Sequence, residues 1–251
     1  MRHVLLEVIV TSLDDARVAA AGGADRFELC AALALGGLTP SLGLIDSIKR
    51  ELPDVPVMFM LRPREGGMAY SEADLSVMQR DAELALAHGA DGLVFGVLTD
   101  RGEVDASACQ RLLSVARQRP DTQTVFHRAF DVVADSHRAL EQLIDLGFTR
   151  VLTSGRARRA AEGVAEIRRT IDRAAGRIEV LPGGGINAGN ASKIVDATGA
   201  DQVHLSATRT LPDHSTGANP LIRFTAVTSG GENTYRATDP DLVRAVRDAT
   251  N

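Results

Sequence analysis

The sequence predicts a (β/α)₈ barrel, or TIM barrel, built as a single domain over residues 1–251. Eight short runs rich in Val, Ile, Leu and Phe alternate with longer helical patterns, which is typical of this fold. The triplet Gly-Ala-Asp recurs at 23–25, 89–91 and 199–201, each time where a helix should end and a strand begin. An open dinucleotide-binding sheet is disfavoured because no GxGxxG motif follows the first strand.

The expected elements follow in strand–helix order. Strands are expected at 4–10, 25–30, 56–62, 91–97, 122–128, 149–154, 177–182 and 202–206. Helices are expected at 12–21, 42–51, 72–88, 106–118, 135–145, 157–174, 188–197 and 240–249. Ser71 begins a capping box, and Asp105 and Asp135 suit the N-cap of the helices that follow them. The barrel therefore spans about 4–206, and helix 240–249 closes it.

The segment 207–239 does not fit the barrel repeat and is expected to be an appended loop and hairpin. Residues 210–220 read as an exposed loop, and 221–227 and 234–237 read as hairpin arms around a turn at 228–233. The hairpin either covers the barrel mouth or contacts a second copy of the chain. We favour the second interpretation, which predicts a homo-oligomer, most simply a dimer.

Composition excludes several classes of function. The net charge of −5 provides no basic surface for nucleic acid. The longest uncharged run, 29–45, is interrupted by glycine and proline and does not suit a membrane span. Two cysteines, Cys30 and Cys109, cannot form a disulfide framework and fit the reducing cytoplasm, as does a start without signal-peptide character.

Strand alternation predicts which side chains face the barrel interior. When the even-numbered strands are aligned on the Gly-Ala-Asp repeat, one parity is more apolar and should face the helices. The other parity should face inward; it comprises Glu28, Cys30, Val94, Gly96, Leu152, Ser154, His204 and Ser206. By similar reasoning Glu7 points inward, Met58, Met60 and Arg62 share one face, and His127 is expected to point inward.

Charged side chains gather at the carboxyl ends of the strands, where barrel enzymes have their active sites. The candidates are Glu7, Glu28, Arg62, His127 and His204. One carboxylate would act as a general base with a pKa raised by the other, a histidine would be the acid, and Arg62 would hold an anionic group. The alternative is a purely structural network in which Glu28 pairs with Arg62 and Glu7 pairs with His204. The first interpretation predicts an enzyme for a small anionic, sugar-like or phosphorylated metabolite.

Two further features suggest binding sites. Gly183, Gly184 and Gly185 follow the seventh strand and could expose backbone amides to an anion at the start of a helix. Cys30 could be a Cu(I) ligand together with a histidine or methionine. A lone cysteine is more often packing, however, and Cys109 lies on a helix, where we expect it to be buried and inert.

Several motifs together resemble the CutC family of copper homeostasis proteins. They are Glu28-Leu29-Cys30, the segment 36–41 (GGLTPS), Arg62-Pro63-Arg64, the segment 91–98 (DGLVFGVL), the segment 126–131 (FHRAFD), the segment 152–155 (LTSG), the segment 182–185 (PGGG) and the segment 204–207 (HLSA). The resemblance covers about residues 4–209. It implies a cytoplasmic TIM barrel that binds Cu(I), with Cys30 as the cysteine that falls inside a matching motif.

Overall fold

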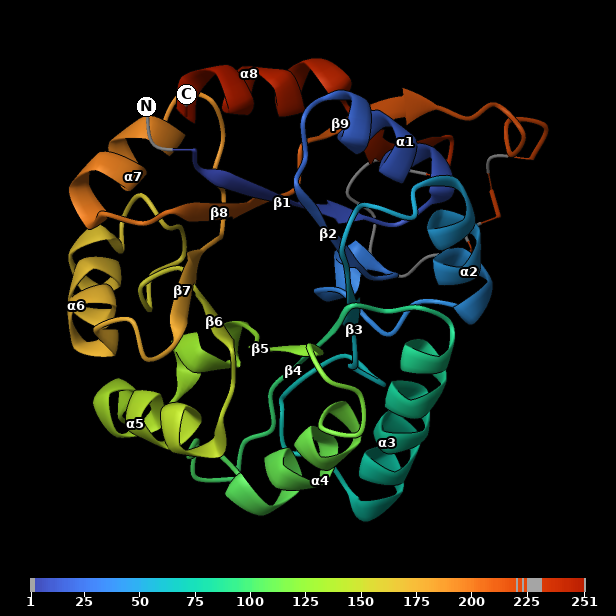
Figure 1. Cartoon of the computed structure of the whole chain (residues 1–251). Helices are drawn as coiled ribbons and strands as arrows, with labels where there is room; N and C mark the ends of the chain where they lie inside the picture. The colour runs from blue at the N-terminus through green and yellow to red at the C-terminus, as the bar shows by residue number, and fades with distance from the viewer. Residues whose placement is uncertain (1–2, 220, 223, 225–231, 251) are drawn as a thin grey trace.

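The computed structural model describes residues 3–219, 221–222, 224 and 232–250. Its centre is a parallel sheet in the order β7-β6-β5-β4-β3-β2-β1-β8. A parallel bridge between Gly183 and His204 joins the two ends of this order, so the sheet closes on itself. Figure 1 shows the ring of strands surrounded by helices. The predicted TIM barrel is confirmed.

The strands are short, and each lies within its predicted range. They are β1 (Leu5–Val10), β2 (Arg26–Leu29), β3 (Val57–Met60), β4 (Gly92–Phe95), β5 (Gln123–Phe126), β6 (Arg150–Thr153), β7 (Glu179–Pro182) and β8 (Gln202–Leu205). The repeated aspartates help to fix their register: Asp25 accepts a hydrogen bond from the amide of Leu6, and Asp91 accepts one from the amide of Val57. In two of its three copies, the Gly-Ala-Asp repeat therefore ties an even strand to an odd neighbour, β2 to β1 and β4 to β3.

The helices form the outer layer. They are α1 (Leu13–Ala21), α2 (Leu42–Glu51), α3 (Glu72–Ala87), α4 (Ala106–Ala116), α5 (Ser136–Leu146), α6 (Val164–Ala174), α7 (Ala191–Thr198) and α8 (Pro240–Thr250), with 3₁₀ turns η1 (Leu33–Leu35) and η2 (Arg128–Val132). The capping box at Ser71 and the side-chain caps at Asp105 and Asp135 are present. No helix in the described ranges is long and apolar enough to cross a membrane.

Helix α6 begins later than predicted. We expected a helix from residue 157, but 157–163 form turns and α6 starts at Val164. The chain first loops back on itself, with Gly155 and Arg156 both at positive φ and the Gly163 backbone packed against Gly155. Arg156 donates a hydrogen bond to the carbonyl of Val133 rather than opening a helix.

Two hydrophobic clusters fill the two sides of the barrel wall, as strand alternation requires. The larger cluster lies between strands and helices and contains Phe27, Leu29, Phe95 and Cys109. The smaller cluster fills the barrel interior; it contains Cys30, Met58, Met60, Val94, Val125, Leu152 and Leu181. The predicted inward parity is therefore correct, and the two cysteines lie in different clusters.

The appended hairpin differs from the prediction in one arm. Strand β9 (Thr208–Pro212) pairs antiparallel with β10 (Thr234–Thr238), so the first arm is 208–212 and not 221–227. The predicted arm is not a strand at 221, 222 and 224, and its other residues, like most of the predicted turn, lie outside the described residues. The Thr238 amide donates to Asp15 of α1, which anchors the hairpin to the barrel.

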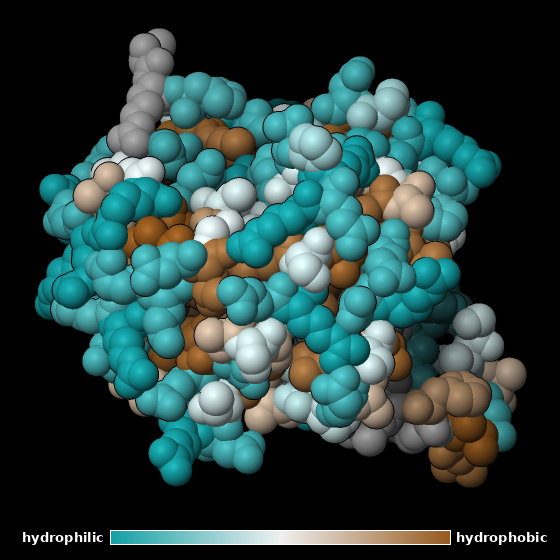
Figure 2. Space-filling model, turned by 60° about the horizontal axis from the view of Figure 1, so that its bottom comes forward, coloured by the Kyte–Doolittle hydropathy of each residue, from teal (hydrophilic) through white to brown (hydrophobic). Residues whose placement is uncertain are grey.

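The hairpin region carries exposed apolar side chains but, within its described residues, does not line the central pocket. Leu221 is 87% exposed and Phe224 is 78% exposed. Figure 2 shows a separate hydrophobic projection at the lower right of a mainly hydrophilic surface. A cover over the mouth is therefore not supported by the described part of the hairpin, and the oligomer remains a prediction.

Candidate functional site

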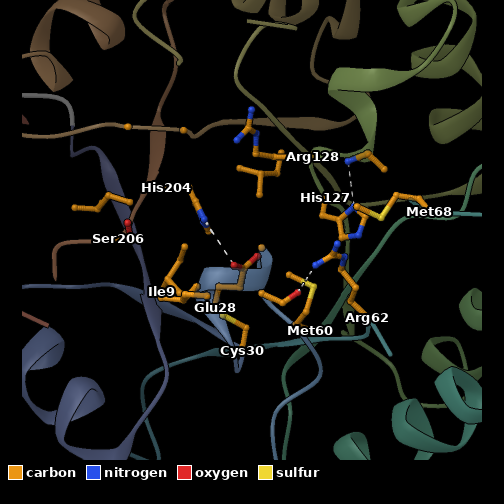
Figure 3. Close-up of a pocket in the computed structure, with 18 residues that line it drawn as sticks. Ile9, Glu28, Cys30, Met60, Arg62, Met68, His127, Arg128, His204 and Ser206 are labelled. Atoms are coloured by element: carbon orange, nitrogen blue, oxygen red, sulfur yellow. Dashed lines mark hydrogen bonds and ion pairs between the residues drawn. The ribbon is translucent and has the colours of Figure 1, made fainter. Parts of the chain in front are cut away.

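A pocket of about 320 Å³ opens at the carboxyl ends of the strands. Among its lining residues are Glu28, Cys30, Met60, Arg62, His127, Arg128, Gly184, Gly185, His204 and Ser206. Four of the five predicted catalytic candidates line it, and the fifth, Glu7, lies beneath it against His204. Figure 3 shows His204 and Glu28 on one side of the pocket and His127 and Arg62 on the other.

Glu7 is fixed as a buried carboxylate. One oxygen accepts from the guanidinium of Arg26, and the other lies 2.8 Å from Nδ1 of His204. Burial alone would raise the pKa of Glu7, but Arg26 and His204 outweigh it and hold this pKa well below its ordinary value. Because Glu7 is ionised and can only accept, Nδ1 of His204 carries the proton in this contact.

The other nitrogen of His204 faces Glu28. Nε2 lies 3.7 Å from a carboxylate oxygen of Glu28, so the imidazole stands between two carboxyl groups. Burial and the neighbouring Glu7 carboxylate raise the pKa of Glu28 to about 7, although His204 and Arg26 act against this shift. Burial disfavours the charged form of His204, yet Glu28 and Glu7 outweigh it and raise the His204 pKa. The row Arg26–Glu7–His204–Glu28 thus leads from a fixed ion pair to a carboxyl that titrates near neutral pH.

The polar layer in which this row begins was not predicted. Arg26 also donates to Gln202, while Arg150 donates to Glu179 and to Gln123. Each of these side chains lies two residues before an inward-facing position on its strand, as Arg26 lies before Glu28, and therefore also points inward. The same alternation would have found them if it had been extended one layer toward the amino ends of the strands.

The structural alternative required Arg62 to pair with Glu28, and this pair does not form. Its Nη1 donates to the carbonyls of Leu35 and Gly37, and its Nη2 donates to the carbonyl of Gly66. The guanidinium therefore ties the loops after β2 and β3 to the end of β3. The predicted pairing of Glu7 with His204 does form. Of the two pairs in the structural alternative, one is therefore present and the other is not.

His127 lies next to Arg62 and is neutral. Its Nδ1 accepts a hydrogen bond from the Ala129 amide at 3.2 Å, which leaves the proton on Nε2. Burial, together with the nearby Arg62 guanidinium, lowers the pKa of His127 to about 4. This imidazole is therefore a hydrogen-bond donor to the pocket and not a cation at neutral pH.

The glycine segment borders the pocket, but not at a helix start as we expected. Helix α7 begins only at Ala191, beyond a turn in which Asn187 and Asn190 donate to the Gly185 carbonyl. The Gly183 amide donates to Thr153 across the sheet. Gly184 and Gly185 line the pocket with positive φ, where residues with side chains are strained. An anion at these amides remains a prediction.

Arg128 completes the rim beside this loop. It donates to Asp131 at 2.7 Å and to the Ser154 hydroxyl at 2.7 Å. Asp131 also accepts from the Ser154 amide and from the Thr153 hydroxyl, so its oxygens are fully engaged. Asp131, in η2, and Ser154, directly after β6, therefore position Arg128, and their side-chain oxygens are already hydrogen-bonded.

Two sets of atoms could hold a metal ion. Donor atoms of Glu7, Glu28 and His204 lie within 4.8 Å of one another, but both oxygens of Glu7 are already engaged. Cys30 and Met60 offer sulfur to the same pocket. Burial and the Glu28 carboxylate raise the pKa of the Cys30 thiol well above its ordinary value, which disfavours the thiolate.

Comparison with known proteins agrees with this architecture. A family model described as the CutC family matches residues 4–209. The family protein CutC of Treponema denticola is 48% identical over 224 residues, 89% of each chain. The human copper homeostasis protein cutC homolog is 44% identical over 242 residues, 96% of this chain and 87% of that one. A solved CutC structure from Streptococcus agalactiae has a TM-score of 0.76 and 35% identity, covering 80% of this chain and 97% of that chain. The chain therefore belongs to the CutC family, whose members include proteins named for copper homeostasis.

Proposed function

We propose that the pocket is the active site of an enzyme that moves a proton to or from a small anionic metabolite. The observation that carries this proposal is Glu28, a carboxyl that is 3% exposed, lines the pocket and has a pKa raised to about 7 by burial and by Glu7. A general base or acid works best when its pKa lies near the working pH. Purely structural carboxylates are instead held ionised by partners, as Glu7 is.

His204 supports Glu28 in this role. Glu7 accepts a hydrogen bond from Nδ1–H, which fixes the ring so that Nε2 faces Glu28. A proton taken up by Glu28 can then be shared with His204 across a distance that closes by a small movement of either side chain. Arg26 acts indirectly, because it keeps Glu7 ionised and so keeps the His204 imidazole oriented.

The opposite wall supplies positive charge and hydrogen-bond donors. Arg62 is a buried cation, His127 presents Nε2–H, and the glycine segment and Arg128 border the same space. A ligand with a negative group would bind there with its reactive part toward Glu28. A cavity of about 320 Å³ is small for a ligand pocket, since such sites usually span roughly 300–1,000 Å³.

Proton transfer can be tested without knowing the natural substrate. The wild-type protein would be incubated in deuterated buffer with a panel of small hydroxy acids, keto acids and sugar phosphates, and exchange of carbon-bound hydrogen would be followed by NMR. We expect exchange with at least one compound class and a loss of about 10²–10⁴-fold in Glu28→Gln. The exposed Glu65→Gln serves as the matched control. Equal exchange in Glu28→Gln, or none with any compound, would argue against the enzyme.

Cu(I) handling in the cytoplasm is the second candidate. It is favoured by the sulfur-bearing side chains of Cys30, Met60 and Met68, which line one pocket with two imidazoles, because thiolate, thioether and imidazole suit Cu(I). An anaerobic Cu(I) titration against a competing chelator would compare wild type with Cys30→Ser. Cys109→Ser is the control, since Cys109 lies outside the barrel interior. Binding that survives Cys30→Ser would exclude this site.

A further inference from the structure

Unsatisfied polar atoms concentrate in the pocket. In the described residues, five buried side-chain nitrogen or oxygen atoms have no hydrogen-bond partner. Three of them belong to pocket-lining residues: Arg62 Nε, His127 Nε2 and Glu28 Oε1. Their side chains are only 3–5% exposed. Buried polar atoms are normally paired, because leaving one unpaired costs about 1–3 kcal/mol. Three such atoms on one pocket indicate that its ligand supplies the partners.

Two of the three atoms are donors on the same wall. Nε2 of His127 must carry the ring proton because Nδ1 accepts from Ala129. Nη1 of Arg62 already donates to two carbonyls, whereas Nε has no partner. Nη2 donates to the Gly66 carbonyl, and the Arg62 guanidinium also interacts with the Tyr70 hydroxyl. The edge formed by Nε and Nη2 is the one that binds a carboxylate in a bidentate manner.

The third atom is an acceptor on the opposite wall. Glu28 Oε2 faces His204, whereas Oε1 has no partner. A hydroxyl group is the simplest neutral donor that this oxygen can accept from. The complementary ligand therefore carries an oxyanion at one end and a hydroxyl close by.

We infer that the inner part of the pocket binds a small hydroxy acid, with its carboxylate on Arg62 and His127 and its hydroxyl on Glu28. This inference rests on the proposed function and names the substrate class for it. The carboxylate is planar and singly charged, as the edge of one guanidinium and one neutral imidazole require. A phosphate group brings about −1.5 to −2 charges and three acceptor oxygens toward a wall with two guanidinium groups, of which Arg128 is already paired with Asp131, and with Glu28 opposite.

The ligand series tests the inference on the wild-type protein. Binding of racemic glycerate would be measured by NMR titration, with the side-chain nitrogen signal of His127 as the reporter. Propionate lacks the hydroxyl groups, glyceramide lacks the charge, and inorganic phosphate lacks the carboxylate. We expect glycerate to bind about tenfold or more tightly than each of the three, and to shift the Nε2 signal.

Two variants assign the contacts. His127→Asn keeps an acceptor for the Ala129 amide but loses the Nε2 donor, and should weaken glycerate about tenfold. Glu28→Ala removes the acceptor and should make glycerate and propionate bind alike. Arg64→Gln is the matched control, since this arginine follows Arg62 closely in the chain but does not line the pocket. Circular dichroism verifies the fold of each variant.

Results that contradict the hydroxy acid can be told apart from results that contradict the proposed enzyme. Equal binding of glycerate and propionate to wild type, or no response to glycerate, would overturn the hydroxy acid. Tighter binding of phosphate that is unchanged in His127→Asn would also overturn it and would move the anion to the glycine segment. In each case, deuterium exchange that depends on Glu28 with some other compound would leave the proposed enzyme standing.

Discussion

The ion pair between Glu7 and Arg26 offers a quantitative test of how the site is built. Both side chains are at most 3% exposed, and Arg26 donates to one oxygen of Glu7. At an effective dielectric constant of about 20, unit charges about 4 Å apart attract by about 4 kcal/mol. Removing one member of a buried pair leaves the other charge uncompensated, which typically costs about 3–5 kcal/mol. We therefore expect Glu7→Gln to lower the free energy of unfolding by about 3–5 kcal/mol at pH 7.

The pH dependence of this loss follows from the lowered pKa of Glu7. A carboxyl whose folded-state pKa is depressed stabilises fully above its unfolded value, here about 4.5, and loses that contribution as the pH falls through its folded pKa. The contribution of Glu7 itself to the difference between wild type and Glu7→Gln should therefore be complete above about pH 5 and shrink below about pH 4. Urea unfolding followed by circular dichroism measures both quantities.

A double substitution separates the pair from the packing. Glu7→Gln with Arg26→Met removes both charges, so its cost should be less than the sum of the two single costs by more than about 1 kcal/mol. The surface pair of Arg17 with Glu51 is the control, because Glu51→Gln breaks a pair whose side chains are 42–50% exposed and should cost far less, although that pair has two hydrogen bonds. A loss below about 1 kcal/mol for Glu7→Gln, or one that widens in acid, would refute the reasoning.

Three further predictions concern the pocket and the thiols. Because the pKa of Glu28 is raised from 4.5 to about 7, the native state holds the extra proton and stability falls as pH rises through this window; Glu28→Gln should therefore gain on wild type by about 3 kcal/mol between pH 4.5 and 8 in urea unfolding. In Gly96→Ala the new Cβ would lie 2.6 Å from Nδ1 of His127, so a loss of about 1–3 kcal/mol is expected, whereas Gly43→Ala meets nothing within 4 Å and should be neutral or slightly stabilising. Both cysteines are fully buried with raised thiol pKa values, so an aromatic disulfide reagent should react with them only after denaturation; rapid reaction of the native protein would contradict their burial.

The sequence predicted the site well because strand geometry leaves little freedom. Side chains alternate between two faces, so the Gly-Ala-Asp repeat that aligned the even strands also fixed the inward direction of Glu28 and His204. Parallel strands end at one rim, which brings residues of β1, β2 and β8 together although 197 positions separate Glu7 from His204.

The sequence-based prediction failed where several partners lie within reach of a long side chain or a loop. Charge alone suggested that Arg62 would meet Glu28, but the carbonyls of two loops lie within its reach and satisfy most of its donors. The start of α6 was wrong because Gly155 and Gly163 allow a close backbone contact that no hydrophobic period reveals. The hairpin arm was wrong because pairing of β9 with β10 depends on two segments far apart in the chain.

The charges in the barrel interior become less tightly held toward the mouth. At the level of Arg26 and Glu7 both partners are ionised and engaged, so that layer contributes rigidity. One layer higher, His204 is held on one nitrogen only, and Glu28 keeps one oxygen without a partner. Each unpaired buried atom costs free energy. In the described residues the lower layer leaves one such atom, Nη1 of Arg150, whereas Glu28, Arg62 and His127 leave three at the pocket. The cost is concentrated at the open end, where a ligand would meet these atoms, and this is the arrangement expected if the lower layer exists to hold Glu28 and His204 in a fixed position for chemistry.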